Sequence, residues 1–156
     1  MRIKTAVIEE TEEISNLIRS LSGPFFLSPN GEGADSFVES ISPEAIKKYI
    51  SSDNFLYLTG KIDAHLVGVV AIRDNKHLFH LFVSPASQGK GLGRRLWHKA
   101  KEAALKAGNV GEFSVNSSLN AVPVYAAFGF KAVGDVRTSN GISFQPMLLS
   151  VHSNAV

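Results

Sequence analysis

Residues 77–99 read HLFHLFVSPASQGKGLGRRLWHK, and this stretch decides the fold. Its first part, His77 to Val83, is rich in Phe, Leu and Val and stops before Pro85, whose missing N–H ends a sheet ladder. From Leu92 onward, apolar residues recur at helical spacing until Gly108, which is a suitable helix stop. The stretch therefore predicts a strand, a glycine-rich turn and a helix in direct succession.

The turn between this strand and helix has the composition of an anion site. Gly89, Gly91 and Gly93 carry no Cβ atoms that would hold a ligand away from the backbone, and the helix that follows begins with unpaired N–H groups. Lys90 and Arg94 add positive charge at the helix end where the dipole favours acidic side chains. We therefore expect a phosphate-like ligand here, although a flexible glycine loop on a basic surface would have the same composition.

Two common phosphate-binding motifs do not fit the turn. A Walker A motif needs Gly-Lys followed by Ser or Thr, and Gly91 follows Lys90 here. A dinucleotide-binding fingerprint that begins at Gly89 needs glycine at position 94, which is Arg94. The sequence thus argues against both nucleotide-binding folds.

The composition limits the function classes. A chain of 156 residues with 44% hydrophobic residues predicts one domain, residues 1–156. The formal charge of +2 is too small to indicate a nucleic-acid partner, so the basic cluster is better assigned to one small anionic ligand. The absence of cysteine excludes disulfides, a thiolate nucleophile and a Cys-based zinc site. The five histidines lack the paired spacing of a helical metal site, so no metal is expected.

The sequence gives no sign of a membrane or secretory segment. Its apolar runs are too short to cross a bilayer, and its N-terminus lacks the apolar region of a signal peptide. We therefore expect a soluble cytoplasmic protein without a membrane partner.

The remaining elements follow from hydrophobic periodicity and from turn residues. Residues 55–83 are typical of a three-stranded meander with turns at Asp63-Ala64 and Asp74-Asn75. Residues 25–53 are the least regular part of the chain. Strands are predicted at residues 2–8, 55–62, 65–73, 77–83, 111–115, 131–136 and 142–151, and helices from Thr11, at 42–51, from Leu92 and at 122–128. This order predicts an α+β fold around a mixed sheet.

The turn resembles the signature of the GCN5-related N-acetyltransferase (GNAT) superfamily, Gln/Arg-x-x-Gly-x-Gly/Ala, which Gln88, Gly91 and Gly93 match. The segments LFVSP at 81–85 and NAVPVYAAFGF at 120–130 resemble the family's adjoining strand and second cofactor segment, in the family's order and spacing. The resemblance covers roughly the C-terminal half of the chain. It implies a three-layer fold with a mixed, mostly antiparallel sheet of about seven strands flanked by helices. It also implies that the sheet is splayed between its fourth and fifth strands, where the cofactor's pantetheine arm lies.

The resemblance implies acetyl coenzyme A (acetyl-CoA) as the cosubstrate, with its pyrophosphate on the glycine turn. Backbone N–H groups at Phe82 and Val83 match those that contact the thioester carbonyl. Asn116 and Asn120 match positions that often bond to the cofactor arm or begin the last helix, and both read equally well as turn or N-cap residues. The expected cofactor-binding residues are Phe82, Val83, Gln88, Gly89, Lys90, Gly91, Leu92, Gly93, Arg94, Asn116, Asn120 and Tyr125.

Amine acetylation needs a neutral amine, a polarised carbonyl and a proton for the departing thiolate. Tyr125 falls where the family carries a tyrosine aimed at the coenzyme sulfur, which implies a general acid; the alternative is an ordinary half-buried tyrosine. Many members carry a glutamate base on the signature strand, and here the candidates are His77 and His80. They lie on opposite faces of a regular strand unless a bulge intervenes. Either histidine is equally well a packed core residue, and the amine could also arrive deprotonated.

In the family, the acceptor site is shaped mainly by the N-terminal helices and loop. Here that region predicts Phe25, Phe26 and Glu32 as acceptor-binding residues, unless both phenylalanines belong to the core. The resemblance thus implies a single-domain N-acetyltransferase that acts on a primary amine of a small molecule or peptide, by direct transfer in a ternary complex. The alternatives are a CoA-binding sensor or inactive regulatory module, and a nucleotide-phosphate binding domain. A homodimer is left open.

Overall fold

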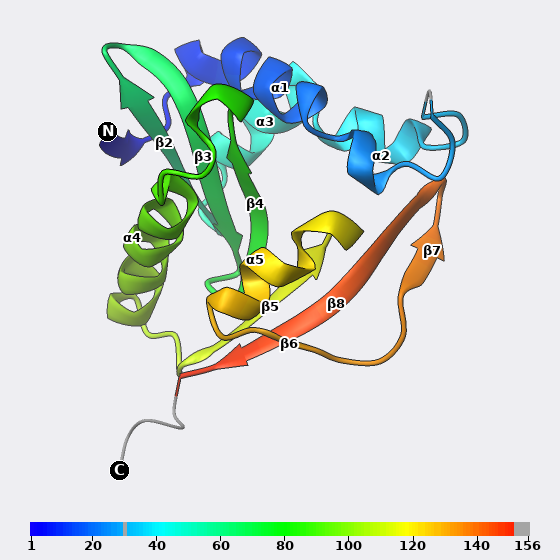
Figure 1. Ribbon diagram of the computed structural model, residues 1–156. Helices are drawn as coiled ribbons and strands as arrows, with labels where there is room; N and C mark the ends of the chain where they lie inside the picture. Colours follow the sequence, from blue (N-terminus) through cyan, green and yellow to red (C-terminus); the bar gives the residue numbers. More distant parts are fainter. Residues whose placement is uncertain (30, 152–156) are drawn as a thin grey trace.

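A computed structural model describes residues 1–29 and 31–151 (Figure 1). The strands are β1 (Arg2–Thr5), β2 (Phe55–Ile62), β3 (His65–Arg73), β4 (His77–Val83), β5 (Glu112–Ser117), β6 (Lys131–Ala132), β7 (Arg137–Ser139) and β8 (Ile142–Ser150). The α-helices are α1 (Thr11–Ser20), α2 (Asp35–Ser40), α3 (Pro43–Ser51), α4 (Leu92–Lys106) and α5 (Val122–Ala127). The strand order is β1-β2-β3-β4-β5-β8-β6, with β7 paired to β8. The predicted α+β fold is confirmed.

The sheet opens between β4 and β5, its only parallel neighbours among the described strands. These two strands pair only at His77–Ser114 and Leu78–Val115, after which they diverge. The register of β4 against β3 also shifts between Ala71 and Ile72, so Phe79 is an extra residue that bulges and bends β4. The expected splay between the fourth and fifth strands is therefore present.

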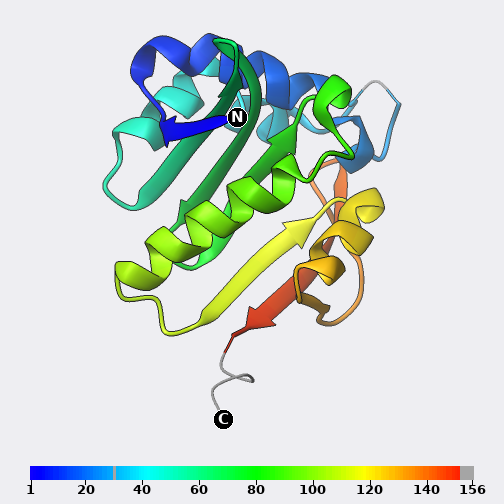
Figure 2. The same cartoon turned by 60° about the vertical axis from the view of Figure 1, so that its left-hand side comes forward.

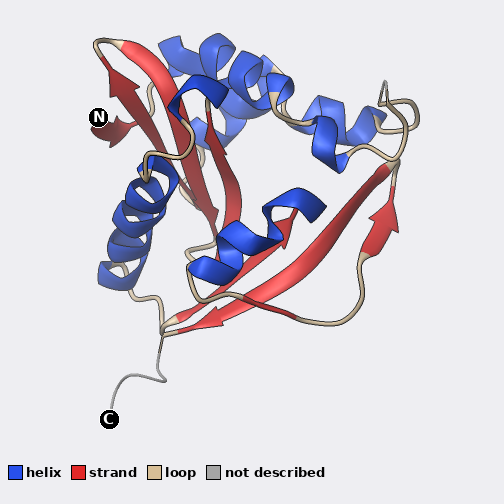
Figure 3. Cartoon of the chain, viewed as in Figure 1, coloured by secondary structure: helices blue, strands red, loops and turns tan. Residues whose placement is uncertain are grey.

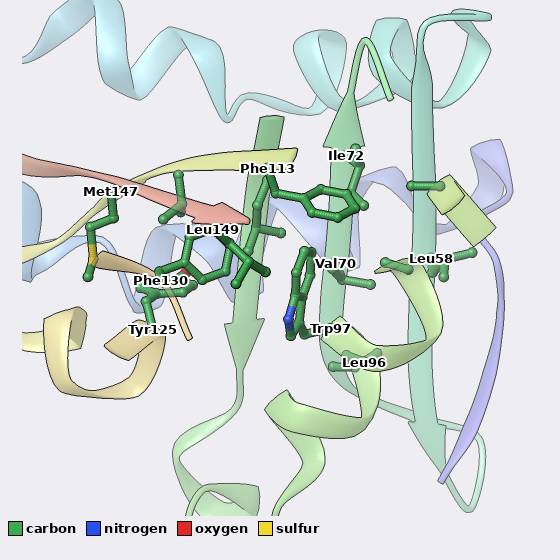
Figure 4. Close-up of a cluster of buried hydrophobic side chains, with 14 residues drawn as sticks. Leu58, Val70, Ile72, Leu96, Trp97, Phe113, Tyr125, Phe130, Met147 and Leu149 are labelled. Atoms are coloured by element: carbon green, nitrogen blue, oxygen red, sulfur yellow. The ribbon is translucent and has the colours of Figure 1, made fainter. Parts of the chain in front are cut away.

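Helices cover both faces of the sheet and give three layers (Figures 1 and 3). On one face α4 crosses β2, β3 and β4, and α5 lies beside the C-terminal strands (Figure 2). The core on this face joins both halves of the sheet, because Trp97 of α4 packs edge-on against Phe113 of β5 at 5.1 Å and also contacts Phe130 (Figure 4). On the other face, α1 and α3 bury a second core around Ile14, Ile46 and Val69.

Three parts of the structure differ from the sequence prediction. The first strand ends at Thr5, because residues 8–10 form a 3-10 turn that continues into α1. Residues 35–40 form helix α2, which was not predicted. The predicted strand 131–136 is only two residues long, and a further strand, β7, pairs with β8, so the described residues contain eight strands. The β7–β8 turn is Asn140-Gly141 with both φ angles positive, which is a hairpin signal that the sequence reading missed.

No helix in residues 1–29 and 31–151 has both the length and the apolar character needed to span a bilayer.

Candidate active site

The glycine turn presents open backbone at the start of α4. Gly89 and Gly91 both have φ of 77°, in the left-handed region that glycine tolerates best, and Gly91 is the N-cap of the helix. A Cβ atom at either position would meet no atom within 4 Å. The N–H of Arg95 donates to the Gly91 carbonyl at 3.1 Å, so the preceding N–H groups of the first turn have no acceptor within the helix. This geometry suits an anion that approaches the backbone closely.

The charges around the turn are positive. The first turn of α4 contains no acidic residue, and the guanidinium of Arg94 lies over the Phe128 ring at 5.1 Å. This contact holds Arg94 beside the turn by a cation–π interaction. Lys90 is exposed within the turn itself.

Two adjoining hollows run from the turn into the splayed sheet. The outer cleft, about 480 Å³, is lined by Leu81, Val83, Ser87, Gln88, Gly89, Gly91, Leu92, Gly93, Arg94, Val124, Tyr125, Ala127 and Phe128. The inner cleft, about 180 Å³, is lined by Leu21, Pro24, Phe25, Leu78, Phe79, Leu81, Phe82, Val83, Gln88, Val115, Asn116, Ser118, Asn120 and Tyr125. The two share Leu81, Val83, Gln88 and Tyr125, so they are neighbouring parts of one site between β4, β5, α4 and α5.

The β4 edge offers two backbone donors to this site. The N–H of Ser84 donates to the Val67 carbonyl of the β3 side at 2.8 Å, and the pairing continues as Val83–Gly68, Phe82–Val69 and Leu81–Val70. Because antiparallel neighbours alternate, the N–H of Phe82 points to β3, whereas those of Leu81 and Val83 point to the opening. The amide of Gln88 donates to the Val83 carbonyl at 2.9 Å, which agrees with that orientation. The geometry therefore moves one of the expected donors from Phe82 to Leu81.

Tyr125 reaches the site from α5. It is 7% exposed, lines both clefts and packs edge-on against Phe128. It also packs edge-on against Phe130 (Figure 4). Burial raises the pKa of its hydroxyl well above the ordinary value of 10.0. The phenol therefore stays protonated at neutral pH, where it can donate a proton and cannot act as a phenolate base.

The two histidines of β4 lie on the same face because of the bulge at Phe79. The imidazole of His80 is buried, its Nδ1 lies 2.8 Å from the Tyr57 hydroxyl, and burial lowers its pKa to about 3. His77 lies where β4 and β5 are still paired, with Nδ1 at 2.7 Å from the Ser114 hydroxyl. Burial, helped by the nearby Arg73 charge, lowers the pKa of His77 to about 4. Both imidazoles are neutral at pH 7, and neither belongs to the described residues that line the clefts.

The two asparagines lie at the inner cleft. Asn116 is exposed at the end of β5, and Asn120 follows it on the approach to α5. The Asn120 side-chain oxygen accepts a hydrogen bond from the Ser118 hydroxyl at 2.9 Å. Helix α5 itself begins after Ala121 without a side-chain cap, so Asn120 is not its N-cap.

Of the three predicted acceptor residues, only Phe25 lines the inner cleft. Phe26 packs edge-on against Phe37 at 5.9 Å and forms a backbone bridge with Ile142, which ties this segment to β8. Glu32 is exposed and is not a lining residue of either cleft. Neither of these two positions lines the inner or the outer cleft.

The sequence reading missed the apolar wall of the inner cleft. Leu21 and Pro24 come from the end of α1 and the turn after it, and Phe79 comes from the β4 bulge. The helix stop at Gly23-Pro24 could have been used to predict that Leu21 and Pro24 lie at the end of α1. The bulge at Phe79 could not be predicted, because one extra residue does not change the pattern of a continuous apolar run. Among the described residues, no group of three or more potential metal ligands occurs.

Comparison with known proteins gives a consistent result. Residues 27–151 match the family model described as an acetyltransferase (GNAT) domain, whereas no curated protein matches the chain. The fold is similar to a GCN5-related N-acetyltransferase structure from Rhodopseudomonas palustris described as "Aminotransferase, Class-II", at 19% identity and a TM-score of 0.79, covering 96% of this chain and 95% of that one.

Two further similar structures were determined with coenzyme A. The PaiA N-acetyltransferase from Thermoplasma acidophilum is 20% identical with a TM-score of 0.74, covering 96% of this chain and 98% of that one. An aminoglycoside 6′-N-acetyltransferase is 13% identical with a TM-score of 0.71, covering 96% and 97%. These identities show the fold alone, and the family model, which matches most of the chain, shows the family. The chain belongs to the GCN5-related N-acetyltransferase (GNAT) family of acetyltransferases.

Proposed function

We propose that the protein transfers the acetyl group of acetyl-CoA directly to a primary amine in a ternary complex. The observation that carries the proposal is the continuity of the site. The glycine turn at the start of α4 lines the outer cleft, and the free β4 edge and Tyr125 line both clefts. Two structures of similar fold were determined with coenzyme A, which supports the same ligand here.

The chain's residues fit the pyrophosphate and the pantetheine arm. The open space in front of Gly89 and Gly91, the unpaired N–H groups of α4 and the positive charge of Arg94 suit two linked phosphates. The outer cleft then leads along the β4 edge, where the N–H groups of Leu81 and Val83 can donate to the arm and to the thioester oxygen.

The reaction forms a C–N bond between the amine and the acetyl carbon and breaks the C–S bond of the thioester. Backbone N–H groups of the β4 edge stabilise the negative charge that develops on the carbonyl oxygen. The Tyr125 hydroxyl gives its proton to the departing sulfur and regains one from the nitrogen, directly or through water. The products are an N-acetyl amine and the free thiol. The chain contains no cysteine that could carry an acetyl intermediate, which supports direct transfer.

The amine must lose a proton before or during the transfer. Imidazoles with pKa values of about 3 and 4 are poor bases near neutrality, so we assign His80 and His77 structural roles. None of the described residues that line the inner cleft is a carboxylate. We propose that the amine binds in its neutral form, because an apolar environment disfavours the charged form.

The test is release of CoA thiol from acetyl-CoA across a panel of small amines and short peptides, with mass spectrometry of the product. Thiol release with a mass increase of one acetyl group on the acceptor supports the proposal. Cofactor binding by calorimetry without any transfer would instead favour a CoA-binding sensor or inactive regulatory module. The observation that favours this second function is that the described cleft residues provide no ionisable base.

A further inference from the structure

The walls of the inner cleft are uncharged, and most of their apolar side chains lie at the α1 end and on β4. Leu21, Pro24 and Phe25 face it from the α1 end, and Phe79 and Phe82 face it from β4. None of the described residues that line it is Asp, Glu, Lys, Arg or His, and its polar groups are confined to amides, hydroxyls and backbone. The described residues that line the cleft therefore provide no opposite charge for a charged group on a ligand.

These walls are held in place by aromatic packing. The Phe79 ring lies 5.2 Å from Phe55 and 5.0 Å from Tyr49, both edge-on. The Phe25 ring lies 5.2 Å from Phe37 of α2. Both rings are fixed from behind, so a ligand meets a preformed apolar surface.

The nearest histidine does not add charge to this surface. Phe79 and Phe82 line the cleft and lie against the buried His80, with ring separations of 4.3 Å and 5.8 Å. His80 itself is bonded to the Tyr57 hydroxyl beneath them. Glu32, which the sequence predicted as an acceptor-binding residue, is exposed and does not line the cleft.

The size of the inner cleft also restricts the ligand. Its volume is about 180 Å³, part of which adjoins the thioester position at Val83 and Tyr125. An apolar cavity of roughly 150 Å³ can hold benzene. The remaining space suits one ring or a short alkyl chain.

We infer that the acceptor is a small apolar primary monoamine, with an aryl or alkyl body and no second charged group. The inference rests on the proposed acetyl transfer and specifies its substrate class. A second ammonium group would lose its hydrating water in the cleft without gaining an opposite charge. This desolvation penalty weakens the binding of polyamines and aminoglycosides, whereas a monoamine has no second ammonium group to desolvate. One of the structures of similar fold is an aminoglycoside acetyltransferase, so the fold alone would have suggested an acceptor with several charged groups.

The experiment compares two pairs of amines that differ in one ammonium group. Benzylamine is compared with 4-(aminomethyl)benzylamine, and butylamine with 1,4-diaminobutane, by thiol release at saturating acetyl-CoA. We expect kcat/KM to favour the monoamine by at least about tenfold in each pair. Equal or better use of the diamines by the wild-type protein would overturn the inference. Failure to acetylate any of the four amines or the wider panel, with cofactor bound, would count against the acetyl transfer itself.

A pair of conservative variants locates the selectivity. Asn116→Asp adds a carboxylate to the inner cleft with almost no change of shape, and Asn16→Asp makes the same change on the exposed side of α1. Asn116→Asp should reduce the monoamine-to-diamine ratio of kcat/KM severalfold, and Asn16→Asp should leave that ratio unchanged. An Asn116→Asp protein that binds CoA normally and keeps the wild-type ratio would overturn the assignment of selectivity to this cleft.

Discussion

Tyr125 shows how burial decides what one side chain can do. Its side chain lines both clefts, and burial raises the pKa of its hydroxyl, so we propose that it keeps its proton for the departing sulfur. We expect Tyr125→Phe to lower kcat by roughly tenfold or more, while the KM for acetyl-CoA stays within about threefold, because the proton is needed only in the transition state. Steady-state kinetics with calorimetric measurement of CoA affinity separates the two effects. A rise in KM with unchanged kcat would contradict the role of Tyr125 as the acid.

The pH at which kcat/KM rises should be set by the pKa of the acceptor amine and not by a side chain of the protein. If the neutral amine is the reactive form, kcat/KM rises with pH up to the pKa of the free amine. An acid loses its function only above its own pKa, so the raised pKa of Tyr125 moves the falling limb beyond about pH 10. Profiles measured with benzylamine and the less basic trifluoroethylamine should therefore have rising limbs at different pH values. A rising limb near pH 6 to 7 that is common to both amines would indicate a histidine base instead.

His80 makes folding stability depend on pH. Burial lowers its folded pKa from 6.5 to about 3, so below pH 6.5 the unfolded chain binds a proton that the folded chain does not. This contribution to stability is complete above pH 6.5 and is lost as the pH falls. We expect wild type to lose roughly 2 to 3 kcal/mol by pH 4.5 relative to a His80→Gln variant, measured as the change between pH 7 and 4.5 in urea unfolding.

The control for this measurement is His98→Gln, because His98 is exposed on α4. That variant should follow the wild-type pH dependence. Parallel curves for wild type and His80→Gln would show that His80 is protonated in the folded protein as easily as in the unfolded chain.

At the scale of elements, we propose that the start of α4 binds the pyrophosphate. Gly91→Ala places a methyl group in the open space in front of the helix and forces a left-handed conformation on alanine. Gly108→Ala creates similar strain at the other end of α4, also in open space and with φ of 103°. Each variant should lose roughly 1 kcal/mol of stability.

Only the first variant should lose cofactor affinity. We expect the Kd for CoA to rise roughly tenfold or more in Gly91→Ala and to stay within about twofold in Gly108→Ala, both measured by calorimetry. Equal affinities in the two variants would contradict the assignment of the pyrophosphate to this turn.

At the scale of the whole molecule, the features that could be predicted from the sequence are those set by neighbouring residues. The strand, turn and helix of residues 77–106 were predictable because proline, glycine and helical periodicity act over a few residues. The hairpins at Asp63-Ala64 and Asp74-Asn75 were also predicted and are confirmed by the pairing of β2, β3 and β4. The splay of the sheet between its fourth and fifth strands was implied by the family resemblance and not by periodicity.

The remaining features depend on tertiary contacts. The β4 bulge, which brings His77 and His80 to one face, is fixed by pairing with β3 and has no composition signal. Phe26 and the segment after it are held by the β7–β8 hairpin, which lies more than a hundred residues later in the chain. The assignment of Leu81 in place of Phe82 as a donor likewise needed the register of the sheet.

The two halves of the sheet should become coupled when the cofactor binds. The glycine turn belongs with β1 to β4 and Tyr125 with β5 to β8, and the described residues of β4 and β5 are paired at only two positions. A ligand that spans both halves stabilises the folded state by mass action, by roughly 2.7 kcal/mol at a concentration of 100 Kd. For a chain of 156 residues this corresponds to a rise in Tm of roughly 5 to 10 °C.

We expect CoA to produce that rise in Tm. Pantetheine lacks the pyrophosphate and ATP lacks the pantetheine arm, so each should produce a much smaller rise at equal concentration. Hydrogen exchange with CoA should slow on both sides of the opening, in residues 81–93 and in α5. A larger shift with ATP than with CoA would instead assign the site to a nucleotide.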